Sequence, residues 1–139
     1  MTNQPSQPSH LLPIDRVLQA FEAGNVAELM AHIADDIDFR IDHFHDEADT
    51  SWQVAADKAG LMTVLQRLAT DVFPKGTRIL ETHSTPLGDE WALTRLHQTF
   101  FYGVSQCIVN SVTWIISHAS QGQLDYFRET VTTIDPLPA

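Results

Sequence analysis

The side chains of this sequence that could transfer a proton stand in two of its β-prone runs. Arg95 and His97 lie two residues apart in one run, so on a strand they would share one face of a sheet. Glu129 lies in the last run, with the same parity as Phe127. A histidine beside a carboxylate in an apolar cavity can be tuned towards neutral pH and serve as a general acid or base. His97, Glu129 and Arg95 are therefore the candidate catalytic residues.

A second cluster of ionisable side chains, Asp-His-Phe-His-Asp-Glu, occupies positions 42–47. His43 and His45 are two residues apart, as two metal ligands on one strand would be. No third, distant ligand is evident in the sequence, and the cluster runs into an acidic, polar loop that is typical of a solvated rim. We therefore predict no metal site, and we keep His43 as a polar group at the mouth of a pocket.

Other catalytic motifs are missing from the sequence. It has no serine or cysteine nucleophile motif, no phosphate-binding glycine loop and no dinucleotide fingerprint, so we expect chemistry without a cofactor, or no chemistry. Cys107 is the one cysteine, which excludes an intrachain disulfide. Its apolar neighbours favour a buried, inert thiol.

Length and charge restrict the class of protein. A chain of 139 residues fits one domain, which we place at residues 11–135 after a flexible lead at residues 1–10. The net charge of −10 disfavours binding to nucleic acids and to anionic membranes. No apolar run approaches the roughly 20 residues of a membrane span. We expect a cytoplasmic protein.

The first half of the chain predicts helices around one strand. Apolar residues recur at helical spacing from Leu12 to Phe21, Gly24 ends that helix, and Asn25 can cap a second helix whose apolar side includes Ile33. The period then changes to two over residues 37–42, which predicts a half-buried strand. A third helix follows over residues 55–69.

The second half of the chain is predicted to be entirely β. Four runs, at residues 77–85, 90–103, 106–118 and 123–133, are separated by short turns, so they must be antiparallel neighbours. Helices followed by a strand meander indicate an α+β domain with a curved, mixed or antiparallel sheet.

Three stretches resemble the nuclear transport factor 2-like superfamily. They are residues 20–25 (AFEAGN) continuing into 34–39 (ADDIDF), the third helix over 57–68, and 122–129 (GQLDYFRE). The resemblance implies a cystatin-like cone, in which three N-terminal helices wrap a curved sheet around an internal pocket for a small hydrophobic or aromatic molecule.

The resemblance also implies which side chains enter that pocket. Besides the three catalytic candidates, the expected ligand-binding residues are Phe39, Ile41, His43, Phe101, Asn110, Trp114 and Phe127. A homodimer through the outer face of the sheet is implied as well, and we expect Val109, Ile115 and Leu124 to make that face apolar.

This chain lacks key catalytic residues of the known enzymes of this superfamily. Aligned with ketosteroid isomerases, the base position falls on Ile41 and the two donor positions fall on Val17 and Trp114. In limonene-epoxide hydrolases a Tyr and an Asn hold the attacking water, and these would be Phe39 and Ile41. In SnoaL-like polyketide cyclases an acid–base group moves a proton, and His97 would replace the usual aspartate.

Two functions from different classes remain. The first is a SnoaL-like isomerase, cyclase or hydrolase with His97 as acid–base and with Glu129 and Arg95 as tuning partners. The alternative is a non-catalytic small-molecule-binding or accessory protein of the same fold, in which the His–Glu–Arg network only satisfies buried polar groups. Pure docking to another protein is a third possibility, and it predicts a filled cavity and a large exposed apolar patch.

Overall fold

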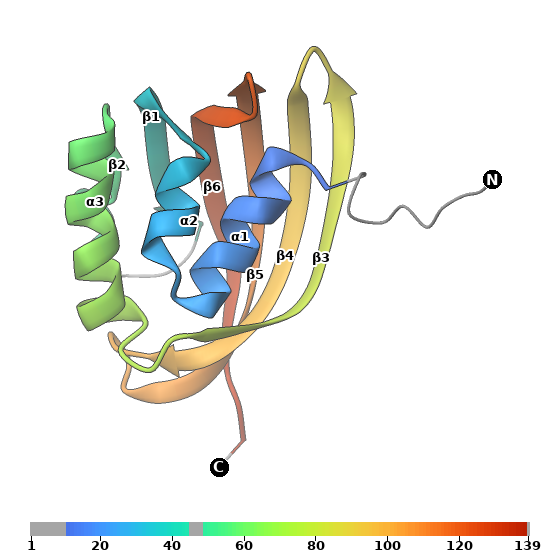
Figure 1. Ribbon diagram of the computed structural model, residues 1–139. Helices are drawn as coiled ribbons and strands as arrows, with labels where there is room; N and C mark the ends of the chain where they lie inside the picture. Colours follow the sequence, from blue (N-terminus) through green and yellow to red (C-terminus); the bar gives the residue numbers. More distant parts are fainter. Residues whose placement is uncertain (1–10, 45–48, 139) are drawn as a thin grey trace.

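The computed structural model describes residues 11–44 and 49–138, which form three α-helices, one π-helical turn and six strands (Figure 1). The helices are α1 (Pro13–Ala23), α2 (Val26–Ala31) and α3 (Lys58–Arg67), and α3 continues into the π-helical turn η2 (Leu68–Val72). The strands are β1 (Ile33–His43), β2 (Val54–Ala55), β3 (Thr77–Gly88), β4 (Trp91–Tyr102), β5 (Cys107–Ser120) and β6 (Gln123–Pro136). The predicted lead, residues 1–10, lies outside the described residues. No helix in the described part of the chain is long and apolar enough to cross a membrane.

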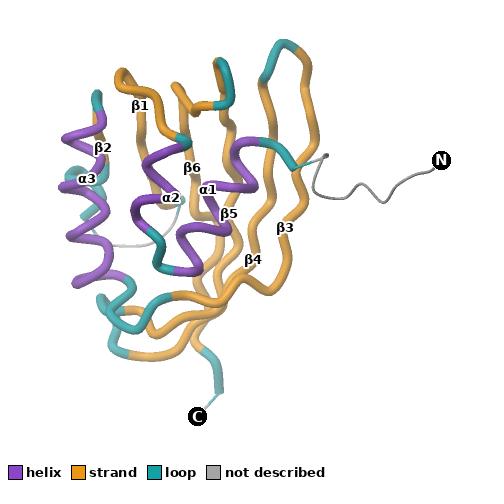
Figure 2. The backbone as a smooth tube through the Cα atoms, in the orientation of Figure 1, coloured by secondary structure: helices purple, strands orange, loops and turns teal. Residues whose placement is uncertain are grey.

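The strands form one mixed sheet in the order β2-β1-β6-β5-β4-β3. Strands β3 to β6 are the predicted antiparallel meander, and β1 joins its end by pairing in parallel with β6. The sheet is curved, and the helices lie together on one side of it (Figure 2). The predicted fold class, an α+β domain with a curved sheet wrapped by three N-terminal helices, is therefore confirmed.

Local capping explains where the first two helices begin and end. The Asp15 carboxylate accepts a hydrogen bond from the backbone N–H of Leu12 (2.9 Å), and Gly24 ends α1 in the left-handed region at φ 70°. The Asn25 side chain accepts from the N–H of Glu28 (3.1 Å) and so starts α2. These boundaries are the ones that the sequence predicts.

Two local predictions are wrong, and one short strand is missing from them. Ile33 begins β1 and pairs with Leu124, instead of lying on the second helix, because that helix ends after two turns at Ala31. The third helix begins at Lys58, later than predicted, since Asp57 caps it by accepting from the N–H of Gly60 (2.7 Å). The two-residue strand β2 is too short to leave a period in the sequence.

Two carboxylates of α1 fix this helix over the edge of the sheet. Asp15 Oδ1 accepts from the Ser84 hydroxyl (2.6 Å), and that hydroxyl lies 2.8 Å from the Thr94 hydroxyl on the next strand. In the last turn of the helix, Glu22 Oε2 accepts from the backbone N–H of Ile79 (2.6 Å). Charge-assisted bonds of this kind are short and comparatively strong, so α1 is held in register with β3.

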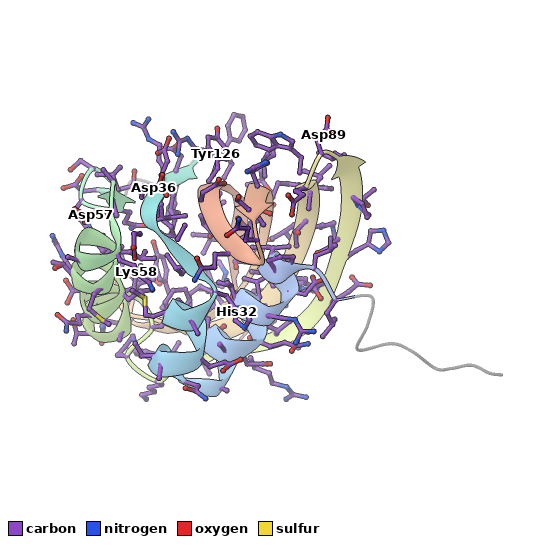
Figure 3. All side chains as sticks on the ribbon, turned by 45° about the horizontal axis from the view of Figure 1, so that its top comes forward. His32, Asp36, Asp57, Lys58, Asp89 and Tyr126 are labelled. Atoms are coloured by element: carbon purple, nitrogen blue, oxygen red, sulfur yellow. The ribbon has the colours of Figure 1, made fainter. Side chains whose placement is uncertain are left out.

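The acidic residues that give the chain its net charge of −10 are mostly exposed. Figure 3 shows Asp36, Asp57 and Asp89 on three different parts of the surface. Carboxylates that remain in water keep their hydration, so this excess negative charge costs the fold little.

One close backbone contact ties the helical layer to the β4–β5 hairpin, and it predicts a large effect at Gly103. The N–H of Gly103 donates to the Val72 carbonyl (3.0 Å), and a Cβ added at Gly103 would collide with the carbonyl oxygen of Asp71. Gly103→Ala should therefore lower the free energy of unfolding by about 1–3 kcal/mol, as overpacking does. Urea unfolding measures this loss.

Gly60→Ala is the matched control, because its Cβ would lie 3.1 Å from the nearest atom, within a helix that favours alanine. The nearest atom is Asp57 Oδ1, a side-chain atom that can move by a few tenths of an ångström, so we expect this variant to lose much less stability than Gly103→Ala. An unchanged urea midpoint for Gly103→Ala would contradict the predicted collision.

Candidate functional site

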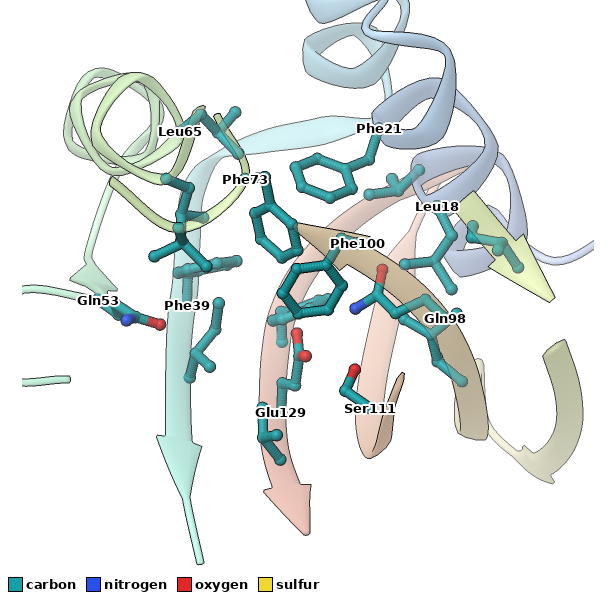
Figure 4. Close-up of a pocket in the computed structure, with 18 of the residues that line it drawn as sticks. Leu18, Phe21, Phe39, Gln53, Leu65, Phe73, Gln98, Phe100, Ser111 and Glu129 are labelled. Atoms are coloured by element: carbon teal, nitrogen blue, oxygen red, sulfur yellow. The ribbon is translucent and has the colours of Figure 1, made fainter. Parts of the chain in front are cut away.

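A cavity of about 90 Å³ lies between the inner face of the sheet and helices α1 and α3 (Figure 4). A buried water occupies roughly 10–15 Å³ on this scale, so the cavity has room for several waters or one small molecule. Its helical side is lined by Val17, Leu18, Phe21, Leu61, Leu65 and Leu68. Its sheet side is lined mainly by Phe39, Ile41, Leu96, Phe100 and Phe127. The cavity is therefore apolar over most of its wall.

Aromatic rings build two sides of this wall. Phe39 and Phe127, on the paired strands β1 and β6, stack with their centroids 4.7 Å apart. Phe73, which follows η2, contacts Phe100 at 4.5 Å and Phe21 of α1 at 5.2 Å. Rings packed in these arrangements have few alternative positions. They give the cavity flat, firm surfaces that suit a planar ligand.

Glu129 places a carboxyl group inside this apolar wall. In the sheet its backbone lies between Ile41 of β1 and Ile115 of β5, so its side chain projects from the inner face. The Thr113 hydroxyl donates a hydrogen bond to Oε2 (3.0 Å), although the Thr130 carbonyl lies at the same distance and competes for the one proton. The part of Glu129 that protein atoms leave uncovered faces the cavity (Figure 4).

The apolar surroundings change the acidity of this carboxyl group. Burial raises the pKa of Glu129 from 4.5 to about 7, and the hydrogen bond from Thr113 opposes that shift. Near neutral pH the group is thus divided between its acid and its carboxylate. A group with this property can accept a proton and return it within one catalytic cycle.

Four predicted ligand-binding residues lie on the cavity wall together with Glu129. They are Phe39, Ile41, His43 and Phe127, all on β1 or β6. Strand β1 alternates strictly between apolar and charged residues from position 37 to 42, so its inner face is unambiguous.

The prediction that Arg95 and His97 enter the pocket is wrong. Their neighbours Leu96 and Gln98 line the cavity, and alternate residues of a strand point to opposite faces. Arg95 instead pairs on the outer face with Glu81 of β3, at 3.2 Å from Nη1 to Oε1. The sheet itself therefore separates His97 and Arg95 from Glu129.

Phe101, Asn110 and Trp114 are also on the outer face, contrary to prediction. Trp114 is 41% exposed, and Lys75 Nζ lies 4.4 Å above the Phe101 ring. Asn110 alternates with buried Ser111, which lines the cavity. The physical reason is the same as for β4, because a shift of one residue exchanges the two faces of a strand.

The residues that were expected to make the outer face apolar also lie on the opposite face of the sheet. Val109, Ile115 and Leu124 are buried beneath the helices. The large apolar side chains that the outer face exposes on β5 are instead Ile108 at 52%, Trp114 at 41% and Ile116 at 43%.

Sequence reasoning missed three uncharged polar side chains in the cavity. Gln98, Ser111 and Gln53 are 5%, 2% and 3% exposed, and all three line the wall. A signal existed for Gln98, since it shares parity with Leu96 and Phe100 on β4. Gln53 precedes the short strand β2, where no periodicity marks the inner face.

The described residues include only one of the two histidines considered as metal ligands. His45 lies outside them, and His43 stands at the end of β1. Within residues 11–44 and 49–138, no group of three histidine, cysteine or acidic side chains is arranged to hold a metal ion.

Comparison with known proteins finds similarity in structure. No family model and no curated protein matches the sequence. An NTF2-like protein from Burkholderia xenovorans superposes with a TM-score of 0.66 and 18% identity over 86% of each chain. A proposed polyketide cyclase from a Silicibacter species gives 0.67 and 12% over 86% of this chain and 85% of its own. A protein of cystatin-like fold from Xanthomonas campestris gives 0.69 and 15% over 87% and 91%.

The chain has the nuclear transport factor 2-like fold. In this fold, as in the other common folds, function follows from the site and not from the architecture. The cavity of this nuclear transport factor 2-like domain, with Glu129 as its ionisable group on β6, is the candidate functional site.

The raised pKa of Glu129 predicts how stability depends on pH. Between pH 4.5 and about 7 the unfolded chain has lost the Glu129 proton and the folded chain keeps it, so this residue's contribution to stability falls as pH rises. The full loss is about 3 kcal/mol, at 1.36 kcal/mol for each pKa unit. Glu129→Gln cannot ionise, so it should gain about this much stability relative to the wild type across the same range.

Urea unfolding of both proteins, from below pH 4.5 to above pH 7, measures this difference. Glu81→Gln, an exposed carboxylate on the outer face, is the matched control and should show no such gain. Curves for wild type and Glu129→Gln that stay parallel through the range would contradict the shifted pKa.

Proposed function

We propose that this protein is a SnoaL-like, polyketide cyclase-like enzyme that moves a proton on a small hydrophobic or aromatic molecule without a cofactor. Glu129 is the acid–base residue. One observation carries the proposal: a carboxyl group with a pKa of about 7 lies in the wall of an apolar cavity. Solved structures of the same fold include proposed polyketide cyclases and a proposed isomerase, which supports this class of reaction.

The reaction uses Glu129 as base and then as acid. The carboxylate takes a proton from a carbon next to a substrate carbonyl: the C–H bond breaks, an O–H bond forms on Glu129, and the electron pair delocalises as an enolate. In an isomerisation Glu129 returns the proton to another carbon of the same molecule. In a cyclisation the enolate carbon bonds to a second carbonyl carbon, and the new alkoxide takes the proton from Glu129.

The contacts of Glu129 suit this double role. Thr113 holds Oε2 by a hydrogen bond, and the carboxyl group points into the cavity (Figure 4). The apolar wall makes the carboxylate a stronger base than it would be in water, and it also excludes solvent from a reactive enolate. His97 and Arg95, which lie beyond the sheet, have no part in this mechanism.

The second candidate function is binding without turnover. It is favoured by the fact that, within the described part of the chain, Glu129 is the one carboxylate on the cavity wall. A non-catalytic small-molecule-binding or accessory protein could use the same walls, with the neutral acid as a hydrogen-bond donor to its ligand.

Exchange of α-protons distinguishes the two functions without a known substrate. β-Tetralone is a small bicyclic ketone, and its α-protons exchange with D₂O through the enolate. The wild type should accelerate this exchange, and Glu129→Gln should lower the acceleration by roughly 10²- to 10⁴-fold, as loss of a general base does. Proton NMR follows the exchange.

The controls are His97→Ala, Arg95→Ala and Glu81→Gln, all on the outer face, and each should keep the wild-type exchange rate. Exchange by Glu129→Gln at the wild-type rate would reject Glu129 as the base. β-Tetralone that binds but does not exchange faster than in buffer would favour the non-catalytic function.

We also propose that the protein is a homodimer in the cytoplasm, paired through the outer face of the sheet. Support comes from Ile108, Trp114 and Ile116, large apolar side chains of β5 that stand exposed on that face. Such patches on a chain of this size are typical of interaction sites. A lone thiol such as Cys107 fits the reducing cytoplasm.

Trp114→Glu tests the dimer. The wild type should sediment at twice the chain mass of 15.6 kDa, and the variant should sediment as the single chain, because pairing would bury the introduced charge. Lys58→Glu, at the start of α3 on the helical side of the sheet, is the charge control. A wild type that sediments only at 15.6 kDa at micromolar concentration would end this proposal.

A further inference from the structure

The cavity offers a hydrogen-bond donor on strand β4 that the protein leaves unused. Thr77 Oγ1 donates to Gln98 Oε1 (2.7 Å), which fixes the amide and turns its NH₂ group towards the cavity. No described residue accepts a hydrogen bond from that nitrogen. Ser111 lies opposite Gln98 on the neighbouring strand β5. Its hydroxyl is buried and likewise forms no hydrogen bond with any described residue.

A second unused polar group stands on the opposite side of the cavity. The backbone of Gln53 is fixed, since its carbonyl accepts from the N–H of Ile41 (3.1 Å) and its N–H donates to Thr50 (2.9 Å). Gln53 is 3% exposed, and no described residue forms a hydrogen bond with its side-chain amide. Figure 4 shows Gln53 beside β1 and Gln98 on the far side of Glu129.

Unpaired amides in an apolar cavity are costly for the folded protein. A buried donor or acceptor without a partner costs about 1–3 kcal/mol, so leucine in place of either glutamine would serve a purely structural purpose better. A ligand that fills the cavity displaces any water that could partner these two groups at its opposite ends, so the ligand must supply the partners itself. Gln98 and Gln53 are neutral, so they suit neutral oxygen atoms; a ligand carboxylate or phosphate would be repelled by ionised Glu129.

We infer that the ligand of this cavity is a flat, mainly apolar molecule of about two fused rings with a carbonyl or hydroxyl oxygen at each end. Gln98 and Ser111 bind one oxygen, and Gln53 binds the other. This inference rests on the proposed function, because it names the substrate class of the same cavity. Strands lie about 4.8 Å apart, so Gln53 beside β1 and Gln98 on β4 lie far enough apart to flank a bicyclic molecule. Glu129, between them, then faces the middle of the ring system.

Binding of three graded probes tests the inference without any turnover. The probes are naphthalene, a naphthol, and the naphthalenediols with one hydroxyl on each ring, measured by isothermal titration calorimetry. In the wild type each hydroxyl should tighten binding roughly tenfold, the effect of one good hydrogen bond to an otherwise unpaired group. The best diol isomer should therefore bind about a hundredfold tighter than naphthalene.

Variants that remove the polar groups at one end of the cavity test the two ends separately. In Gln53→Leu, and separately in Gln98→Leu combined with Ser111→Ala, one end remains, so the diol should bind no tighter than the naphthol. When both changes are combined, all three probes should bind alike. Asn110→Leu, on the outer face of β5, is the matched control and should keep the wild-type order. Naphthalene affinity confirms that each variant keeps its cavity, and Gln53→Met replaces Gln53→Leu if the latter does not fold.

The outcomes separate this inference from the proposed function. A diol that binds no tighter than the naphthol to the wild type, or whose advantage survives both end variants, overturns the inference. If the graded order holds but Glu129→Gln exchanges β-tetralone at the wild-type rate, the ligand class stands and the catalytic function falls. If none of the probes binds, the inference is overturned, and the β-tetralone exchange alone decides the proposed function.

Discussion

The structure depends on the small polar side chains of the inner sheet face. Thr94 of β4 and Ser111, Thr113 and Ser117 of β5 are almost completely buried there. Side chains of this size cannot fill the space between a curved sheet and a helical layer. The gap must be closed by long side chains from the helices, such as Leu18 and Phe21, and they leave a cavity.

The same small residues decide how the helices and the carboxyl group are held. Thr94, through the Ser84 hydroxyl, belongs to the chain of hydrogen bonds that reaches Asp15 and so fixes α1. Thr113 donates a hydrogen bond to Glu129 and thereby helps to hold a carboxyl group in an apolar wall. A valine at either position would fill the same volume but would leave a buried partner unsatisfied. Fold and site therefore share one set of hydroxyl groups.

The sequence predicted the elements well and the faces of two strands badly, for one physical reason. Strand β1 has a single apolar parity, Ile37 to Ile41, and its inward side chains were assigned correctly. Strand β4 carries apolar residues on both parities, with Leu96 and Phe100 inside and Phe101 outside. Its alternation therefore does not identify the buried face.

On β5 the pattern is misleading, because three small polar residues share the core face with Val109 and Ile115, whereas Trp114 and Ile116 face outward. The family resemblance placed Trp114 inside, and the period-two pattern did not correct it, because that pattern also gives the larger apolar set to the interior and overlooks Ser111. Pairing with β6 determines the true face, since Thr113 must reach Glu129 across the strand boundary. That information lies in the register of two strands and not in either strand alone.

The position of Glu129 imposes a balance on any reaction in this cavity. A purely apolar ligand that displaced solvent from the carboxyl group would raise its pKa further, and a protonated acid cannot act as a base. A ligand that fills the cavity must therefore bring polar atoms of its own or leave the carboxylate some hydration. The unpaired amides of Gln53 and Gln98 favour the first solution, because they reward a ligand for carrying oxygen atoms. Such a ligand places a polarised carbon beside Glu129, where removal of a proton is easiest, so the groups that select the ligand also keep the base in its active form.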